Sequence, residues 1–165
     1  MRQAICMGLK IYSLTRGSLV VEYLGRVFNA RFFLCSKTSR DLDSELQALG
    51  LTPELPVALI PVKLIENNLQ LIQGVVHYFV NKELLTRIRH EGLLLAMLIT
   101  GFKQLKDLLN SLREAYNETD KYLLVSATEV YNKPVNCIDY PLGDTDFSRS
   151  ITGNVKNVAV ILDLL

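Results

Sequence analysis

Two histidines, three cysteines and one pair of closely spaced aspartates are the side chains of this sequence best suited to chemistry. A histidine can act as a general base or a metal ligand, a thiolate is a nucleophile, and two carboxylates in one loop can contact a hard cation. His77 and His90 have no Cys or Asp at a ligand-like spacing, Cys35 has no base placed to activate it, and Asp144 and Asp146 lack the further acidic positions of a calcium loop. We therefore expect structural roles for these residues, with no catalytic residue, no metal site and no cofactor.

The cysteine count favours a reducing compartment. Cys6, Cys35 and Cys137 are odd in number and far apart in the sequence, so their spacing indicates neither a disulfide framework nor a C-x-x-C pair. Residues 1–15 lack the pattern of a signal peptide, and the longest apolar run, residues 93–99, is far shorter than the ~20 residues that span a bilayer. The sequence therefore predicts a soluble cytoplasmic protein with no membrane contact, which could also enter the nucleus if its source is eukaryotic.

Charge is balanced over the chain but not within its middle. The 18 Lys and Arg residues against 17 Asp and Glu give a net charge of +1, which excludes a surface that is basic throughout. Residues 82–113 hold six basic and three acidic residues. On helices, such an excess can form a cationic face that neutralises phosphates, and the candidate RNA-binding residues are Arg87, Arg89, Lys103 and Lys106.

The elements that must position these side chains follow from hydrophobic periodicity. Residues 11–14, 18–24 and 27–35 are rich in branched and aromatic residues and predict strands. Leu42, Leu46 and Leu49 follow helical spacing and predict a short helix that ends at Gly50. The three prolines of residues 52–61 favour an extended or turning connection.

The second half of the sequence reads as helices followed by a strand. A helical stripe runs from residue 66 to residue 88, a second helix of residues 91–99 is apolar nearly all round, and a third covers residues 102–112. Residues 122–127 predict a buried strand and residues 135–140 a short one, while the tail, residues 155–165, fits either strand or helix. The fold class is therefore α/β in the broad sense (α+β): a single domain over residues 1–165, with a mixed β-sheet packed with several helices.

Three parts of the sequence resemble one known family. They are the segment from Ile60 to His77, the segment Glu91-Gly-Leu-Leu-Leu-Ala-Met-Leu-Ile-Thr-Gly-Phe-Lys-Gln-Leu105, and the strand of residues 122–127. Over residues 57–128 the pattern is similar to that of the small KEOPS-complex subunits, the family of the PRPK-binding protein. Gly101, Lys103, Gln104 and Leu105 fill the places of that family's Gly-x-Arg-Gln-Ile element, with Lys for Arg and Leu for Ile.

The resemblance implies a non-catalytic accessory subunit of the KEOPS complex, which forms N6-threonylcarbamoyladenosine at position 37 of tRNA. Such a subunit docks on a kinase-like ATPase and engages the single-stranded 3′ end of tRNA. Lys103 matches the basic position of the family motif and becomes the first candidate for RNA contact. We expect the apolar helix of residues 91–99 to face the protein partner, through Leu95, Met97 and Leu98.

Two other functions are compatible with the sequence: an enzyme and a homodimer. An enzyme of unrecognised class would need His77, Cys35 or the pair Asp144 and Asp146 to meet in one cleft. A homodimeric interaction module would bury the apolar helix against a second copy of itself.

Overall fold

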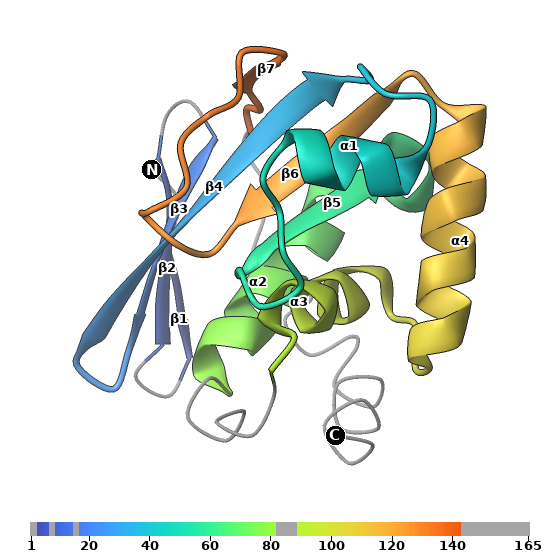
Figure 1. The fold of residues 1–165 in the computed structure, drawn as a ribbon. Helices are drawn as coiled ribbons and strands as arrows, with labels where there is room; N and C mark the ends of the chain where they lie inside the picture. Colours follow the sequence, from blue (N-terminus) through green and yellow to red (C-terminus); the bar gives the residue numbers. More distant parts are fainter. Residues whose placement is uncertain (1–2, 7–8, 15–16, 82–88, 143–165) are drawn as a thin grey trace.

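A seven-stranded sheet forms the centre of the described chain (Figure 1). The computed structural model describes residues 3–6, 9–14, 17–81 and 89–142. The strands are β1 (Gln3–Cys6), β2 (Leu9–Leu14), β3 (Ser18–Tyr23), β4 (Arg26–Ser36), β5 (Val57–Pro61), β6 (Lys121–Ser126) and β7 (Cys137–Asp139). The helices are α1 (Leu42–Ala48), the short 3-10 turn η1 (Val62–Leu64), α2 (Asn68–Val80), α3 (Glu91–Thr100) and α4 (Leu105–Glu118).

The strand order is β1-β2-β3-β4-β6-β5, and every pairing among the described strands is antiparallel. The predicted α+β class with one sheet and several helices is confirmed, although the parallel pairs of a mixed sheet do not occur among these strands. Leu24 and Gly25, both at positive φ, join β3 to β4 as in a type I′ hairpin turn. β7 pairs with Phe33 to Cys35 on the edge of β4 opposite to β6, and so continues the line of β3.

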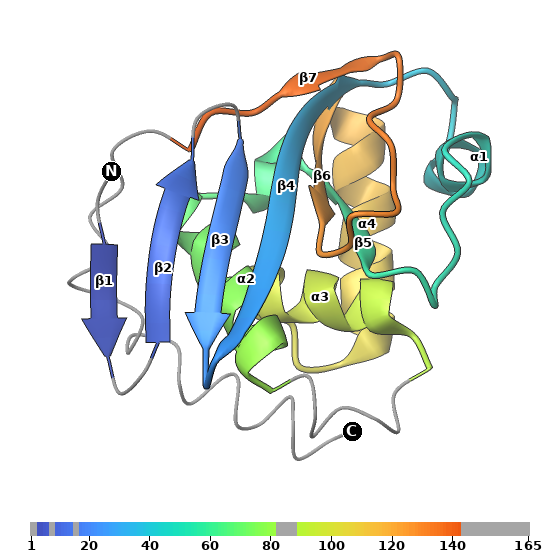
Figure 2. The same cartoon turned by 90° about the vertical axis from the view of Figure 1, so that its left-hand side faces the viewer.

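The helices surround this sheet unequally. α2 and α3 pack against each other, with α2 also contacting β3 and α3 contacting β5. Figure 2 shows α2 behind β3 and β4, and α3 to the right of β4. In Figure 1, α1 lies in front of β5 and β6, and α4 stands beside β5. Within the described residues, no helix is both long and apolar enough to cross a membrane.

β5 was not predicted, because its segment is bounded by prolines. Ala127 N donates to Pro56 O at 2.9 Å, and Val57 lies opposite Ser126. Hydrogen-bonded positions alternate along an antiparallel pair. The backbone groups of Ala58 and Ile60 therefore bond to β6, and the nitrogen of Pro61 points to the outer edge of the sheet. The missing N–H of Pro61 therefore removes no ladder hydrogen bond, which is why proline is tolerated at this strand end.

α2 and α3 approach closely because of a glycine. A Cβ atom at Gly74 of α2 would lie only 2.6 Å from the Cα of Ile99 in α3, so any larger residue would push the two backbones apart. At the same C-terminal end of α3, Gly101 takes φ 81 and donates its N–H to Met97 O at 2.8 Å. This left-handed residue ends the helix and turns the chain towards α4.

The structure corrects the expectation for the cysteines. Cys35 of β4 and Cys137 of β7 lie directly opposite each other, 4.0 Å apart between Cα atoms, and form a disulfide. Their sequence separation of 102 meant that spacing could not predict the pair, because only the return of β7 to the edge of β4 brings the two cysteines together. The inference of a reducing compartment rested on the absence of such a pair, and it loses that support.

Candidate functional site

The junction of α3 and α4 carries the motif on which the family resemblance depends. After Gly101 the chain bends at Lys103 and Gln104. The carbonyl of Gln104 accepts the first hydrogen bond of α4 from Leu108 N at 3.1 Å. Lys103, Gln104 and Lys106 are all exposed. Gln104 makes no side-chain cap hydrogen bond. The N–H groups of the first turn of α4, which have no acceptor within a helix, therefore lie beside two basic side chains.

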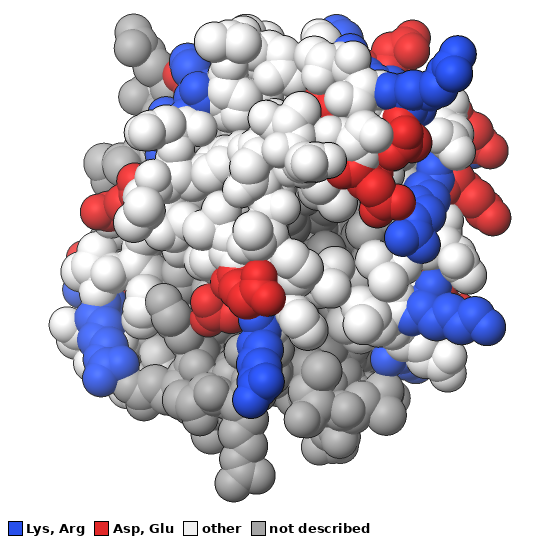
Figure 3. Space-filling model, in the orientation of Figure 1, with Lys and Arg blue, Asp and Glu red and all other residues white. Residues whose placement is uncertain are grey.

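The four candidate RNA-binding residues do not form one cluster. Lys103 and Lys106 lie together at the start of α4, whereas Arg89 precedes the first residue of α3. The ten residues of α3 separate these positions by about 15 Å along the helix axis. Arg87 lies outside the described residues. Figure 3 shows acidic and basic side chains mixed over the face that carries α1 and α4, with basic side chains at the lower right, around the start of α4.

The expected partner-binding residues are part of the core. Leu95, Met97 and Leu98 are 0%, 4% and 7% exposed. They belong to the helix that packs on α2 and β5 within the same chain. The expectation of an uncovered apolar face on α3 was therefore wrong: a helix that is apolar all round is covered here by the rest of the molecule. This also removes that face as the interface of a homodimer.

Exposed apolar side chains occur elsewhere, on the segment that leads into β7. Val130, Val135 and Ile138 are each at least 64% exposed. The segment is nevertheless fixed in place, because Asn136 donates to Ser36 O at 2.8 Å and Cys137 forms the disulfide. The short strand predicted at residues 135–140 is thus present as β7, but the exposure of these three apolar side chains was not predicted.

Among the described residues of the enzyme alternative, none shows the features that catalysis at this site would need. Cys35 is in a disulfide and therefore has no free thiol. His77 is half-buried on α2, and His90 lies before α3 with its Nδ1 4.0 Å from a carboxylate oxygen of Glu54. Asp144 and Asp146 lie outside the described residues. Among the described side chains, no group of three or more His, Cys, Asp or Glu residues is arranged to hold a metal ion.

Sequence reasoning also missed a buried carboxylate. Glu45 of α1 is fully buried and accepts hydrogen bonds from the hydroxyl groups of Tyr122 at 2.6 Å and Tyr116 at 2.9 Å. The backbone N–H groups of Thr38 and Ser39 donate to it at 3.1 and 2.5 Å. Burial alone would raise the pKa of Glu45, but these donors outweigh it and hold the pKa at about 2. Desolvation and the nearby carboxylate raise the pKa of both tyrosines.

A signal for this carboxylate was present in the sequence. Glu45 stands three residues after Leu42 and four before Leu49, on the apolar stripe of the predicted helix. A charged residue at such a position must be paired or hydrogen-bonded. Its partners come from α4 and β6, more than 70 residues away, so spacing could not name them.

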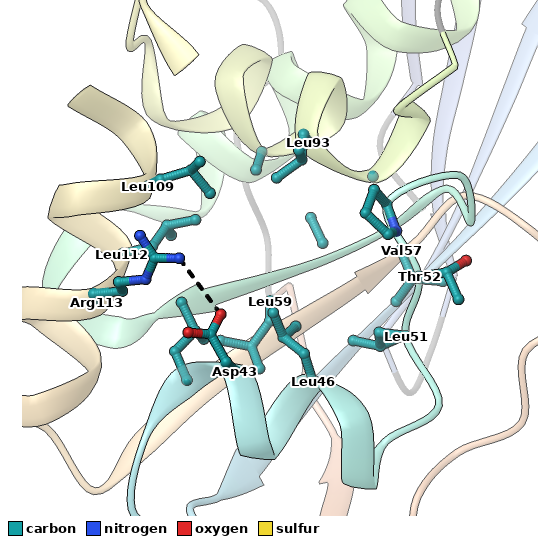
Figure 4. Close-up of a pocket in the computed structure, with 15 residues that line it drawn as sticks. Asp43, Leu46, Leu51, Thr52, Val57, Leu59, Leu93, Leu109, Leu112 and Arg113 are labelled. Atoms are coloured by element: carbon teal, nitrogen blue, oxygen red, sulfur yellow. Dashed lines mark ion pairs between the residues drawn. The ribbon is translucent and has the colours of Figure 1, made fainter. Parts of the chain in front are cut away.

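The helices around β5 leave an apolar pocket (Figure 4). Side chains of α1, α3, α4, β5 and the connection between α1 and β5 line a cavity of about 90 Å³. Those labelled in the figure include Leu46, Leu51, Leu59, Leu93, Leu109 and Leu112. Charge enters only through Asp43 of α1 and Arg113 of α4, whose Oδ1 and Nη2 atoms are 3.5 Å apart. Both side chains are at least half exposed, so the ion pair lies where the pocket meets solvent.

Comparison of the chain with known protein families, with curated proteins and with solved structures found no match. The resemblance to the small KEOPS subunits therefore rests on the residues that carry it.

Proposed function

We propose that this chain is a non-catalytic accessory subunit of the KEOPS complex, which acts in the cytoplasm, binds a kinase-like ATPase and helps to present tRNA for threonylcarbamoylation. The observation that carries the proposal is the placement of the Gly101-Phe-Lys-Gln-Leu105 motif. It forms the turn between two helices, with Lys103 and Gln104 exposed. The residues that resemble the family motif are thus on the surface, where RNA can reach them.

The chemistry of this turn suits a phosphate. The N–H groups at the start of α4 carry partial positive charge, and the ammonium groups of Lys103 and Lys106 outnumber the single carboxylate of that turn, from Asp107. Gln104 can donate and accept hydrogen bonds, as contact with an unpaired base requires. Such a site fits the single-stranded 3′ end of a tRNA better than a duplex, because it is short and local.

The protein partner would use a different surface. Since α3 is covered, we place the kinase-like ATPase on the apolar side chains of Val130, Val135 and Ile138. Apolar side chains that are exposed yet held by an ordered backbone lose little conformational freedom on binding, which favours a protein interface.

The substitution Lys103→Glu tests the RNA contact. It should weaken tRNA binding at least several-fold at low salt, and it should reduce the slope of log affinity against log salt by about one, because one phosphate contact is lost. The measurement is a filter-binding or fluorescence titration with full-length tRNA at several salt concentrations. Lys121→Glu, which changes an exposed lysine at the start of β6, is the matched control. Equal affinities for the Lys103 variant and the unchanged protein would refute the RNA role.

A further inference from the structure

The pocket beside β5 is a cavity that the chain's own side chains do not fill. Its walls come from four elements and are almost entirely apolar. An apolar cavity with few polar partners does not hold ordered water well and is suited to an apolar group. The space of about 90 Å³ is smaller than the ~150 Å³ cavity that accommodates a benzene ring. It therefore fits a group of roughly three or four carbon atoms, by the same comparison.

The rim of the pocket adds one charge of each sign. Asp43 and Arg113 face each other from α1 and α4 at 3.5 Å, and in Figure 4 both lie at one side of the apolar cavity. An exposed ion pair of this kind contributes little to stability. A ligand that supplies a carboxylate to Arg113 and an ammonium group to Asp43 can separate the pair without leaving either charge unpaired.

We propose that this pocket binds a free α-amino acid with a small aliphatic side chain, such as leucine or valine. The side chain occupies the cavity between Leu46, Leu59 and Leu93, the α-carboxylate contacts Arg113, and the α-ammonium group contacts Asp43. One end of the ligand is thus buried among apolar side chains, and the other end forms ion pairs at the rim. This site is separate from the turn at Lys103, and it holds whether or not the chain binds tRNA.

Ligands that each lack one feature test the assignment. L-Leucine should shift the NMR methyl signals of Leu59 and Leu93 with a dissociation constant of about 1 mM or below. Glycine has both charges but no side chain, and phenylalanine has a ring too large for the cavity; neither should shift these signals. Isocaproate lacks the ammonium group of leucine and isopentylamine lacks its carboxylate, so each should bind at least about fivefold more weakly.

Substitutions at the rim test the charges without disturbing the core. Asp43→Asn and Arg113→Gln should each weaken leucine binding at least about fivefold, while the double variant Asp43→Arg with Arg113→Asp should bind more tightly than either, because both charges are restored in exchanged places. Lys63→Gln, which breaks another exposed ion pair, with Glu118, is the control and should bind leucine normally. Circular dichroism checks that each variant is folded.

Three results would overturn the assignment. The first is the absence of methyl shifts with leucine up to about 20 mM, well above the expected dissociation constant. The second is a response to glycine or isocaproate as strong as that to leucine. The third is unchanged leucine binding in folded Asp43→Asn and Arg113→Gln variants.

Discussion

Glu45 shows how much a single side chain can contribute when every lone pair is used. A buried carboxylate without partners would cost several kcal/mol, yet here two tyrosines, a threonine and two backbone N–H groups donate to it. The donors belong to the segment after β4, to α4 and to β6. One charge thus ties α1 to the segment just before it and to two distant elements, α4 and β6. α1 in turn forms one wall of the apolar pocket.

The stability of the protein should therefore fall in acid because of Glu45. Its pKa is about 2 in the folded state against an ordinary value of 4.5, so its contribution is complete above the ordinary value and is lost as the pH falls from 4.5 towards 2. The difference corresponds to about 3 kcal/mol of unfolding free energy. Urea unfolding between pH 7 and pH 2 measures this loss.

Glu45→Gln should remove most of that pH dependence and cost roughly 3–5 kcal/mol at pH 7, because the amide mispairs with buried donors. If this variant does not fold, Tyr116→Phe removes one donor and should cost about 1.5–3 kcal/mol. Glu118→Gln, an exposed carboxylate paired with Lys63, is the control. A steep acid loss that persists in folded Glu45→Gln would show that another group is responsible.

At the scale of the elements, the periodicity of α3 predicts that the helix is buried, but it does not predict what covers the helix. Its nearly all-round apolar sequence predicted a covered helix, and the helix is covered. The covering partner, however, is the same chain: Gly74 lets α2 approach and β5 completes the enclosure. A sequence shows that a surface must be buried, but it does not show whether the burial occurs within the molecule or between molecules.

Paired substitutions distinguish the buried face from the exposed one. Met97→Asp should unfold the chain, since it places an unpaired charge in the core at a cost of several kcal/mol. Val135→Asp should leave the unfolding free energy within about 0.5 kcal/mol of the unchanged value and abolish binding to a purified kinase-like ATPase subunit of KEOPS. Thermal unfolding and a pull-down measure the two effects. A folded Met97→Asp protein that lacks binding, or full binding by the Val135 variant, would contradict this assignment.

Most helices and strands could be predicted from the sequence, with a few exceptions. The strands β2, β3, β4 and β6 and the helices α1, α2 and α3 follow local periodicity, whereas β5 lies between prolines and α4 begins three residues later than expected, after an extended turn. The Cys35–Cys137 disulfide and the partners of Glu45 depend on contacts between residues far apart in the chain. Of the candidate site, only the exposure of Lys103 and its neighbours followed from local pattern.

At the scale of the whole molecule, the disulfide closes the longest covalent loop. It links residues 102 positions apart, and in the chain-entropy account a loop of that length stabilises the folded state by about 3–5 kcal/mol. Reduction by a dithiol should lower the urea midpoint accordingly, and the variant Cys35→Ser with Cys137→Ser should not respond to the reductant.

Thiol counting provides a direct check of this disulfide. Protein purified without reductant and denatured should expose one alkylatable thiol, from Cys6, and three after reduction. Three thiols before reduction would show that the bond does not form in the cell.

The central strand β4 has one neighbour, β3, that comes immediately before it in the chain and another, β6, that comes much later. Leu34 pairs with Leu123 of β6, whereas β3 precedes β4 by only a two-residue turn. While the ribosome is still adding the intervening residues, the hairpin can form but one side of β4 has no strand to bond with. Such an open backbone edge attracts other nascent chains, so the period of synthesis between β4 and β6 is when this protein depends most on chaperones.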